Sequence, residues 1–323
     1  MLIGVGLLAY LIVRAGPATL MHNVKAIGWG LLFIIALGGF AHVVKTFAWR
    51  LALPSRSTNF STAFGLRLVS EAVGQLGLVG QVLGEAMRVS LLGPNVPVQS
   101  GISSATLDRG IFIASGAALT IIGLLTTIAF VALPGAIRSY AFVFAAVLVV
   151  FVAALGVMIR SRVRFISGTV HVLSRVPRLR NWFESKKQVI DSAERELLNF
   201  YHLSPRAFWL SVALNFLTHA LAIAEVYFIL LFMGVHVGAA GALIVESLTK
   251  LINTVGSLNP GNVGTYEGGN MLIGKVLGLS GGTGLTLALC RRVRSIFWAI
   301  IGGLCLLWFS QRKERQAKQA EAA

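Results

Sequence analysis

The stretch Leu258-Asn259-Pro260-Gly261-Asn262-Val263-Gly264-Thr265-Tyr266-Glu267-Gly268-Gly269-Asn270 decides how this chain folds, because it sets a polar, glycine-rich break between two apolar segments. Pro260 has no backbone N–H and disfavours a helical conformation at Asn259, so a helix that arrives here must end. Gly261 and Gly264 can adopt backbone conformations that are closed to other residues. The stretch therefore predicts an interruption with irregular backbone.

A new helix is expected to begin just after this break. Thr265 is a favourable N-cap residue, and Glu267 then lies in the first turn, where the helix dipole stabilises an anion. Two half-helices would meet end to end. Irregular backbone of this kind is tolerated at membrane depth only where it is buried in protein or lines a cavity. An ordinary polar loop between two spans is the alternative, but the flanking segments are too short and too polar to span alone.

The composition is that of a polytopic α-helical membrane protein. Of the 323 residues, 56% are hydrophobic and 12% are charged, which indicates bilayer-spanning helices rather than a separate soluble domain. Basic cytoplasmic loops and anionic lipid headgroups explain the net charge of +16, so no nucleic-acid partner is expected. Cys290 and Cys305 fall about four turns apart on one predicted helix and cannot pair. No metal-ligand spacing or redox motif is present, and no cofactor is expected.

The apolar segments predict about six full spans in one transmembrane domain that covers residues 1–323. They are Met1–Val13, which is short for a span, and Ile27–Leu53, Ile111–Leu133, Ile137–Ile159, Ala207–Met233 and Thr283–Phe309. Basic residues concentrate in a loop at about 160–206 and a C-terminal tail at about 310–323. Positive-inside asymmetry predicts that both are cytoplasmic, in a protein of the plasma (inner) membrane. Lys45 and Arg50 are expected to snorkel to the interface.

A second unusual segment, Phe60–Leu92, alternates apolar residues with charged and amide side chains. These share helical faces as two triplets on either side of a glycine-rich break at Leu76–Gly80: Arg67, Glu71 and Gln75, then Gln81, Glu85 and Arg88. An amphipathic helix pair on the membrane surface is one interpretation. A re-entrant hairpin explains the central glycines better. It would enter from the cytoplasmic side while Gly238–Leu279 enters from the outer side, and two opposed re-entrant hairpins are typical of inverted-repeat transporters.

Ionisable side chains within these membrane segments need a reason, because each is costly unless it is paired or hydrated. They cluster in the two halves of the chain: Glu71, Glu85, Arg88, Asp108 and Arg109 in the first, and Glu246, Lys250, Glu267, Arg291 and Arg294 in the second. Salt bridges that fix helix packing are the alternative to function, above all for Asp108–Arg109 and Glu246–Lys250. The arginines from Arg291 to Arg294 favour function, because they run against the positive-inside bias and guanidinium is the preferred partner of phosphate.

Four elements together resemble the family of the lysylphosphatidylglycerol synthase transmembrane region. They are Gly84-Glu85-x-x-Arg88, Asp108-Arg109 before a span, Asn259-Pro260-Gly261-Asn262-Val263-Gly264-x-x-Glu267, and Arg291 in the last helix. Asn262 stands where a second glycine is usual, and Asp108 replaces a commoner Glu. The resemblance covers nearly the whole chain and implies a polytopic protein that moves lipids between leaflets. Bifunctional members add a soluble aminoacyl-transfer domain; none is expected here, so this chain should not itself synthesise aminoacylated lipid.

The expected function is therefore that of a lipid transporter or flippase for an anionic or phosphate-bearing lipid, such as a phospholipid, a glycolipid precursor or a hopanoid-type lipid. The cations expected to bind the headgroup are Arg88, Arg109, Lys250, Arg291 and Arg294. The residues expected to shape the hairpin tips and orient these cations are Glu71, Glu85, Asp108, Glu246, Asn259, Pro260, Gly261, Gly264 and Glu267. Glu267 is expected to lie within reach of Arg291 or Arg294, either in the site or as a purely structural salt bridge.

Two other classes of function stay open. A membrane-embedded subunit of a lipid-modifying glycosyl- or acyl-transferase would need a carboxylate general base, with Glu71 or Glu267 as the candidates. A scaffold that positions lipid-biosynthesis enzymes would tolerate charge substitutions in the hairpins. Membrane lipids are the expected partners, together with lipid-biosynthesis enzymes.

Overall fold

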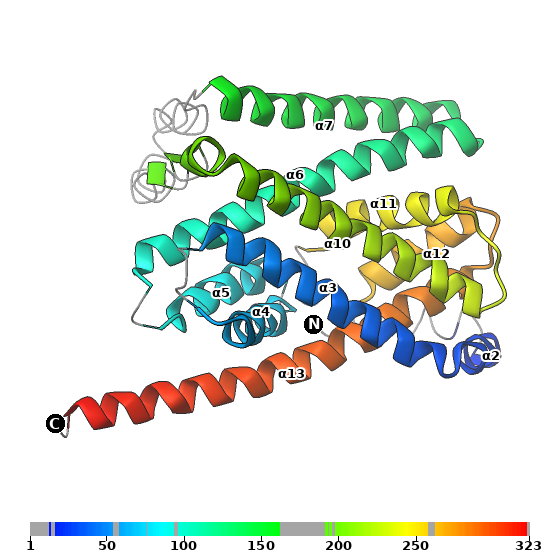
Figure 1. Ribbon diagram of the computed structural model, residues 1–323. Helices are drawn as coiled ribbons and strands as arrows, with labels where there is room; N and C mark the ends of the chain where they lie inside the picture. Colours follow the sequence, from blue (N-terminus) through cyan, green and yellow to red (C-terminus); the bar gives the residue numbers. More distant parts are fainter. Residues whose placement is uncertain are drawn as a thin grey trace, which may run out of the picture.

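The computed structural model describes Val13 and residues 17–53, 58–75, 77–93, 96–161, 191–192, 194–195, 198–257 and 262–321. Every regular element in these ranges is a helix, which confirms the all-α prediction (Figure 1). Within them, five helices are long and apolar enough to cross a membrane: α3 (Gly30–Ala52), α6 (Val98–Phe130), α7 (Gly135–Ser161), α10 (Pro205–Phe232) and α13 (Gly281–Glu321). The sixth predicted span, Met1–Val13, lies outside the described residues except for Val13.

Four shorter helices form two hairpins. The first consists of α4 (Phe60–Gly74) and α5 (Gly77–Ser90), and the second of α11 (Ala239–Gly256) and α12 (Thr265–Val276); the two helices of each pair pack on each other. The first hairpin lies toward the left of Figure 1 and the second toward the right. The structure thus contains the two predicted hairpins, and they lie toward opposite ends of the molecule, although residue 76 at the first break and residues 258–261 at the second lie outside the described residues.

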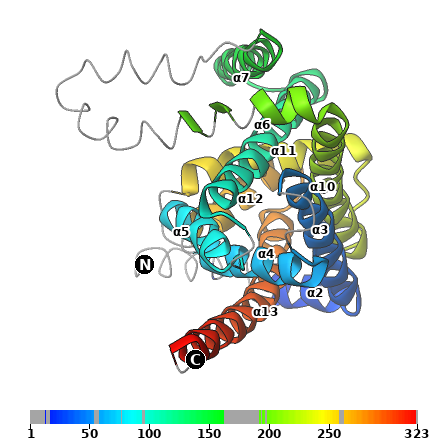
Figure 2. The same cartoon turned by 60° about the vertical axis from the view of Figure 1, so that its left-hand side comes forward.

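The order of spans and hairpins occurs twice along the chain. The helices α3, α4, α5 and α6 correspond in order to α10, α11, α12 and α13. The packing follows the same correspondence, because α3 packs along α10, α4 packs on α13, and α11 packs on α6. Each hairpin therefore lies on the last span of the other half. Of the helices whose full bounds the structure describes, α2 (Pro17–Ile27) and α7 stand outside this repeat, and α7 lies on α6 at the edge of the molecule (Figures 1 and 2).

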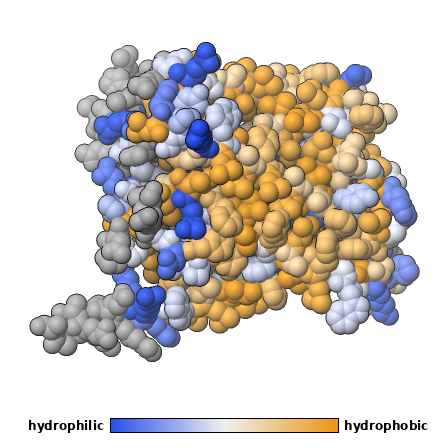
Figure 3. Space-filling view, viewed as in Figure 1, coloured by the Kyte–Doolittle hydropathy of each residue, from blue (hydrophilic) through white to orange (hydrophobic). Residues whose placement is uncertain are grey.

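The surface has the polarity of a membrane protein. In Figure 3, apolar side chains cover the middle of the visible face and hydrophilic residues gather toward its left and right ends. The spans run between these two ends (Figure 1), so the apolar band matches the hydrocarbon core of a bilayer. Large hydrophobic side chains such as Phe40, Val147 and Ile300 are exposed on the spans. The outward face of the helices is therefore suited to lipid.

Glycines allow the hairpins and spans of the two halves to approach closely. A Cβ atom added at Gly302 on α13 would lie 2.1 Å from the Leu68 carbonyl oxygen on α4. One added at Gly123 on α6 would lie 1.8 Å from Ser247 Oγ on α11. These glycines mark the two contacts between a hairpin and the last span of the other half. Small residues at such crossings permit close dispersion contact, which is a main driving force for helix association in lipid.

We predict that Gly302→Leu separates α13 from α4 and destabilises the folded protein by at least about 1–3 kcal/mol. Gly303→Leu is the matched control, because no atom lies within 4 Å of a Cβ at that position. The thermal unfolding midpoint of the detergent-solubilised protein should fall for Gly302→Leu and stay near wild type for Gly303→Leu. Equal midpoints for the two variants would contradict the close packing of α4 on α13.

Candidate functional site

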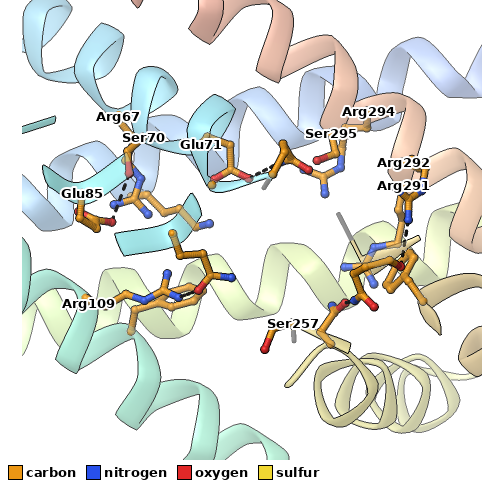
Figure 4. A pocket seen from close by; sticks show the side chains of 18 residues that line it. Arg67, Ser70, Glu71, Glu85, Arg109, Ser257, Arg291, Arg292, Arg294 and Ser295 are labelled. Carbon is orange, nitrogen blue, oxygen red and sulfur yellow. Dashed lines mark hydrogen bonds between the residues drawn. The ribbon is translucent and has the colours of Figure 1, made fainter. Parts of the chain in front are cut away.

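A cavity of about 400 Å³, here called the polar cavity, lies between the two hairpins (Figure 4). Its polar lining comes from Arg67, Ser70, Glu71, Gln75, Gln81 and Glu85 of the first hairpin, from Asn253, Ser257, Asn262 and Tyr266 of the second, from Arg291, Arg292, Arg294 and Ser295 on α13, and from Lys45 and Arg109. Among the described residues, six basic side chains and two acidic ones thus line one volume. This excess of basic groups favours an anionic ligand.

A second volume of about 640 Å³, here called the apolar cavity, adjoins the polar one. Its apolar lining includes Ile113 on α6, Phe144, Leu148 and Phe151 on α7, and Leu221 on α10. The residues that line both cavities are Lys45, Glu71, Gln81, Arg109, Phe112, Asn253, Ser257, Arg291 and Arg294. The second cavity combines this apolar lining with charged side chains, among them Glu225, Glu246 and Lys250, so the two volumes together suit an amphiphilic ligand.

Asp108 on α6 joins two arginines of the first hairpin. Its Oδ2 accepts hydrogen bonds from Arg67 Nη1 at 2.7 Å and from Arg88 Nη1 at 3.2 Å. Arg88 also pairs with Glu85 one turn away, and its guanidinium lies 4.0 Å from the Trp49 ring centroid. Arg88 is fully buried and belongs to the lining of neither described cavity. Arg88 therefore anchors the hairpin and does not line either described cavity. Arg67 lines the polar cavity, although it was not predicted as a site residue.

Arg109 faces away from Asp108, because adjacent residues on a helix do not share a face. Its guanidinium donates to the side-chain oxygen of Gln81 and lines both cavities. Glu85 accepts a hydrogen bond from Ser70 Oγ at 3.3 Å, which orients this carboxylate within the first hairpin. The Asp108–Arg109 pair seen in the sequence is thus divided in space: Asp108 holds the hairpin, and Arg109 faces the cavities.

Glu225 on α10 is a member of the site that was not predicted. Its carboxylate lies 2.5 Å from Arg294 Nε and 3.3 Å from Arg291 Nε. Arg291 Nη1 also lies 2.8 Å from Glu246, which pairs with Lys250 one turn further along α11, as the sequence predicts. The arginines of α13 thus join α10 to the second hairpin. Glu225 could have been found by the rule used for the other charges, because it interrupts an apolar span.

Glu267 has a different partner from the predicted one. The expectation of Arg291 or Arg294 is wrong, because Glu267 Oε1 lies 2.5 Å from Arg292 Nε. Arg291 and Arg294 point instead to the carboxylates of α10 and α11, and Arg292 occupies the side of α13 that meets α12. Glu267 is fully buried, and its Oε2 accepts the Gly264 N–H at 2.7 Å. This carboxylate therefore ties the backbone at the second break to the last span.

The start of α12 also differs from the prediction, since Gly264 and not Thr265 is the N-cap. Gly264 has a φ of +82°, in the left-handed region that glycine adopts without penalty, and Glu267 caps its N–H from three residues on. Asn262 has a φ of +49°. Asparagine tolerates this region better than other non-glycine residues, which explains how it can stand at a position where glycine is usual. Asn259, Pro260 and Gly261 lie outside the described residues.

Lys45 and Glu71 lie where the two cavities meet. Lys45 lines both and does not snorkel to the interface, which corrects the expectation for this residue; its Nζ lies 4.9 Å from the Phe112 ring centroid. Glu71 also lines both, and Gln75 Nε2 lies 3.5 Å from its carboxylate. Neither Lys45 nor Glu71 forms a salt bridge within the described part of the chain. They attract each other electrostatically without forming a salt bridge, and both charges face the cavities, where a ligand would meet them.

The guanidinium and ammonium groups of the site are suited to binding an anion. Within the described ranges, no three His, Cys, Asp or Glu side chains converge as metal ligands do. The predicted cations Arg109, Arg291 and Arg294 line the polar cavity, and Lys250 lines the apolar one. The structure thus brings together four of the five predicted headgroup cations.

We predict that Asp108→Asn destabilises the protein by about 3–5 kcal/mol, because it removes the shared partner of two buried guanidinium groups. The variant should be scarce in membranes and should unfold at a lower temperature than wild type. Arg109→Gln, one residue further along, is the control, since Arg109 contacts an amide and not a carboxylate. Abundance and unfolding midpoints of both variants test this, and a normally stable Asp108→Asn protein would show that the bridge does not hold the hairpin.

A protein-family profile matches most of the chain. The profile of the family described as lysylphosphatidylglycerol synthase TM region matches residues 1–303. No curated protein and no solved structure matches the chain. The matched range includes both hairpins and every residue of the two cavities. The chain therefore belongs to the family of the lysylphosphatidylglycerol synthase transmembrane region.

Proposed function

We propose that this protein moves a lipid with an anionic, phosphate-bearing headgroup between the two leaflets of a membrane. The observation that carries this proposal is the polar cavity, whose described lining has six basic and two acidic side chains. Guanidinium groups bind phosphate well because their N–H donors match its oxygens in pairs. The headgroup would lie between the hairpins and contact Arg109, Arg291 and Arg294.

The arrangement of the hairpins supports transport rather than binding alone. The two hairpins approach the polar cavity from opposite ends of the molecule, and each packs on the last span of the other half. Transporters with inverted repeats bind substrate near the bilayer midplane, between broken helices, and expose it alternately when one repeat moves against the other. Here, movement of one hairpin at a time would open the polar cavity to one leaflet and then to the other.

The apolar cavity supports a lipid as the cargo. It lies among α3, α6, α7, α10 and α11, directly beside the polar cavity. Ala145 and Met158 are the buried residues of α7, so most of this helix faces outward, toward the bilayer. An acyl or isoprenoid tail could therefore stay in apolar surroundings while the headgroup crosses.

We further propose that the protein lies in the inner membrane with the loop at about 160–206 and the C-terminus in the cytoplasm. The end of α7 and the start of α10, which flank this loop, lie at the same end of the molecule as the C-terminal end of α13 (Figure 1). Both segments are rich in Lys and Arg, and the positive-inside bias places such segments in the cytoplasm.

Leaflet exchange in proteoliposomes tests the transport proposal. Vesicles that contain headgroup-labelled phosphatidylglycerol are treated with a membrane-impermeant quencher, and the label that becomes accessible with time is measured. We expect faster exchange than in protein-free vesicles, and a smaller effect on labelled phosphatidylcholine. Absence of acceleration with several anionic lipids would contradict the proposal.

The lipid inventory of a deletion strain separates transport from synthesis. A transporter leaves the lipid species unchanged and alters their distribution between leaflets. The loss of one lipid species would instead support a subunit of a lipid-modifying transferase.

Glu267→Gln is expected to slow leaflet exchange while the protein stays abundant. Glutamine can still accept the Gly264 N–H, but Arg292, whose side chain is 24% exposed, loses the negative charge of Glu267 beside it and would hold an anionic headgroup too tightly. Lys275→Gln, at an exposed position on the same helix, is the control. Loss of the Glu267→Gln protein from the membrane would show that the pair is structural. Normal abundance with normal exchange would remove Glu267 from the site.

A further inference from the structure

The charged side chains around the two cavities do not balance. The cavity charges are defined here as those that line either cavity, together with their salt-bridge partners. The basic members are Lys45, Arg67, Arg88, Arg109, Lys250, Arg291, Arg292 and Arg294, and the acidic members are Glu71, Glu85, Asp108, Glu225, Glu246 and Glu267. Among the described residues, positive charges thus exceed negative ones by two. The undescribed residues at the hairpin breaks, 76 and 258–261, are uncharged in the sequence.

The excess divides between two groups of side chains. Lys45 and Arg109 lie with one carboxylate, Glu71, where the two cavities meet, and Lys250, Arg291 and Arg294 share the two carboxylates Glu225 and Glu246. Every basic member except Lys45 and Arg109 forms a salt bridge with an acidic member. Lys45 contacts the Phe112 ring and is attracted electrostatically by Glu71, and Arg109 donates to Gln81, so neither cation forms a salt bridge with a described carboxylate. Both side chains line both cavities. A ligand at this boundary would therefore meet two cations from different spans, α3 and α6.

A charge excess within a membrane protein is unfavourable until water or a ligand compensates it. A headgroup with a single negative charge would leave one positive charge over, whereas two negative charges would neutralise the set. Glu71 also lies at the boundary and repels an anion there. Glu71 therefore disfavours the binding of weakly charged headgroups, because the attraction between the cations and the headgroup must exceed this repulsion.

On the basis of the transport function proposed above, we infer that the preferred cargo is a lipid whose headgroup carries two negative charges on phosphate. A phosphomonoester dianion and a diphosphate diester share this chemistry. Its phosphate lies between Lys45 and Arg109, the polar remainder of the headgroup extends toward Arg291 and Arg294, and the tail lies in the apolar cavity against α6, α7 and α10.

Competition between lipids with identical tails tests this assignment. The purified protein in neutral detergent micelles receives dioleoyl phosphatidylglycerol together with an equal amount of dioleoyl phosphatidic acid or of cytidine diphosphate–dioleoylglycerol. At about pH 8 a phosphomonoester is dianionic, since its second ionisation lies near pH 6. Native mass spectrometry then measures which lipid the protein retains. We expect retention of a dianionic lipid to exceed that of phosphatidylglycerol roughly tenfold, as for one additional charge-assisted contact.

The two dianionic lipids distinguish the two sources of the charge. Preference for phosphatidic acid alone identifies a phosphomonoester cargo, and preference for the cytidine diphosphate lipid alone identifies a diphosphate diester. Equal retention of phosphatidylglycerol and both dianionic lipids would overturn the inference.

Charge variants locate the preference. Lys45→Gln and Arg109→Gln should each bring the retention ratio close to one, and Glu71→Gln should raise retention of every anionic lipid. Lys275→Gln removes one positive charge from an exposed position and should leave the ratio unchanged. Unfolding midpoints show that each variant is folded. A full preference in the folded Lys45→Gln and Arg109→Gln variants would place the binding site elsewhere and overturn the assignment.

Leaflet exchange, measured separately, distinguishes this inference from the proposed transport. If the protein accelerates leaflet exchange of phosphatidylglycerol but retains all the lipids equally, the transport proposal is supported and the dianionic preference is overturned. Preferential retention without exchange of any lipid would leave the binding site standing and overturn transport.

Discussion

Buried guanidinium groups that pair with carboxylates from other helices determine how this membrane protein is assembled. Apolar contacts between helices differ little in energy from contacts with lipid tails, so they specify neighbours weakly. An unpaired charge in the same surroundings is costly. Asp108 on α6 holds Arg67 and Arg88, and Glu225 holds Arg291 and Arg294 on α13. With the contacts of Glu246 and Glu267, these pairs fix the positions of α4, α5, α10, α11 and α12 against α6 and α13.

In each half, salt bridges link the hairpin to the last span of the same half, but the charges are reversed between the two halves. In the first half, the span supplies the carboxylate, Asp108, and the hairpin supplies Arg67 and Arg88. In the second half, the span supplies arginines, and the hairpin supplies Glu246 and Glu267. Because the halves are opposed, Arg67 of the first array and Arg291 and Arg292 of the second lie on opposite sides of the polar cavity (Figure 4). The reversal keeps most of the charges paired within their own half.

Pairing of most charges leaves the remaining ones available to a ligand. Cations engaged with carboxylates keep their geometry while a ligand enters and leaves, because breaking a buried pair is strongly unfavourable. Lys45, Arg109 and Glu71 have no such constraint among the described residues, and they lie at the boundary between the polar and apolar cavities. Charged residues of the same types therefore serve two purposes. Those in salt bridges hold helices together, and those without a salt-bridge partner contact the ligand.

The sequence by itself determined the features that depend on local chemistry. Long apolar runs form spans, the glycine-rich and proline-containing breaks form hairpins, and the Glu246–Lys250 pair forms because residues four apart share a helical face. Only the tertiary structure decided which distant charges meet. Successive residues on a helix point about 100° apart, so the rotation of α13 sends Arg292 to Glu267 and its neighbours to Glu225 and Glu246. Which helices become neighbours also decides that Lys45 lines the cavities and that Asp108 and Arg109 face different surroundings. The order of residues along the chain does not specify these neighbours.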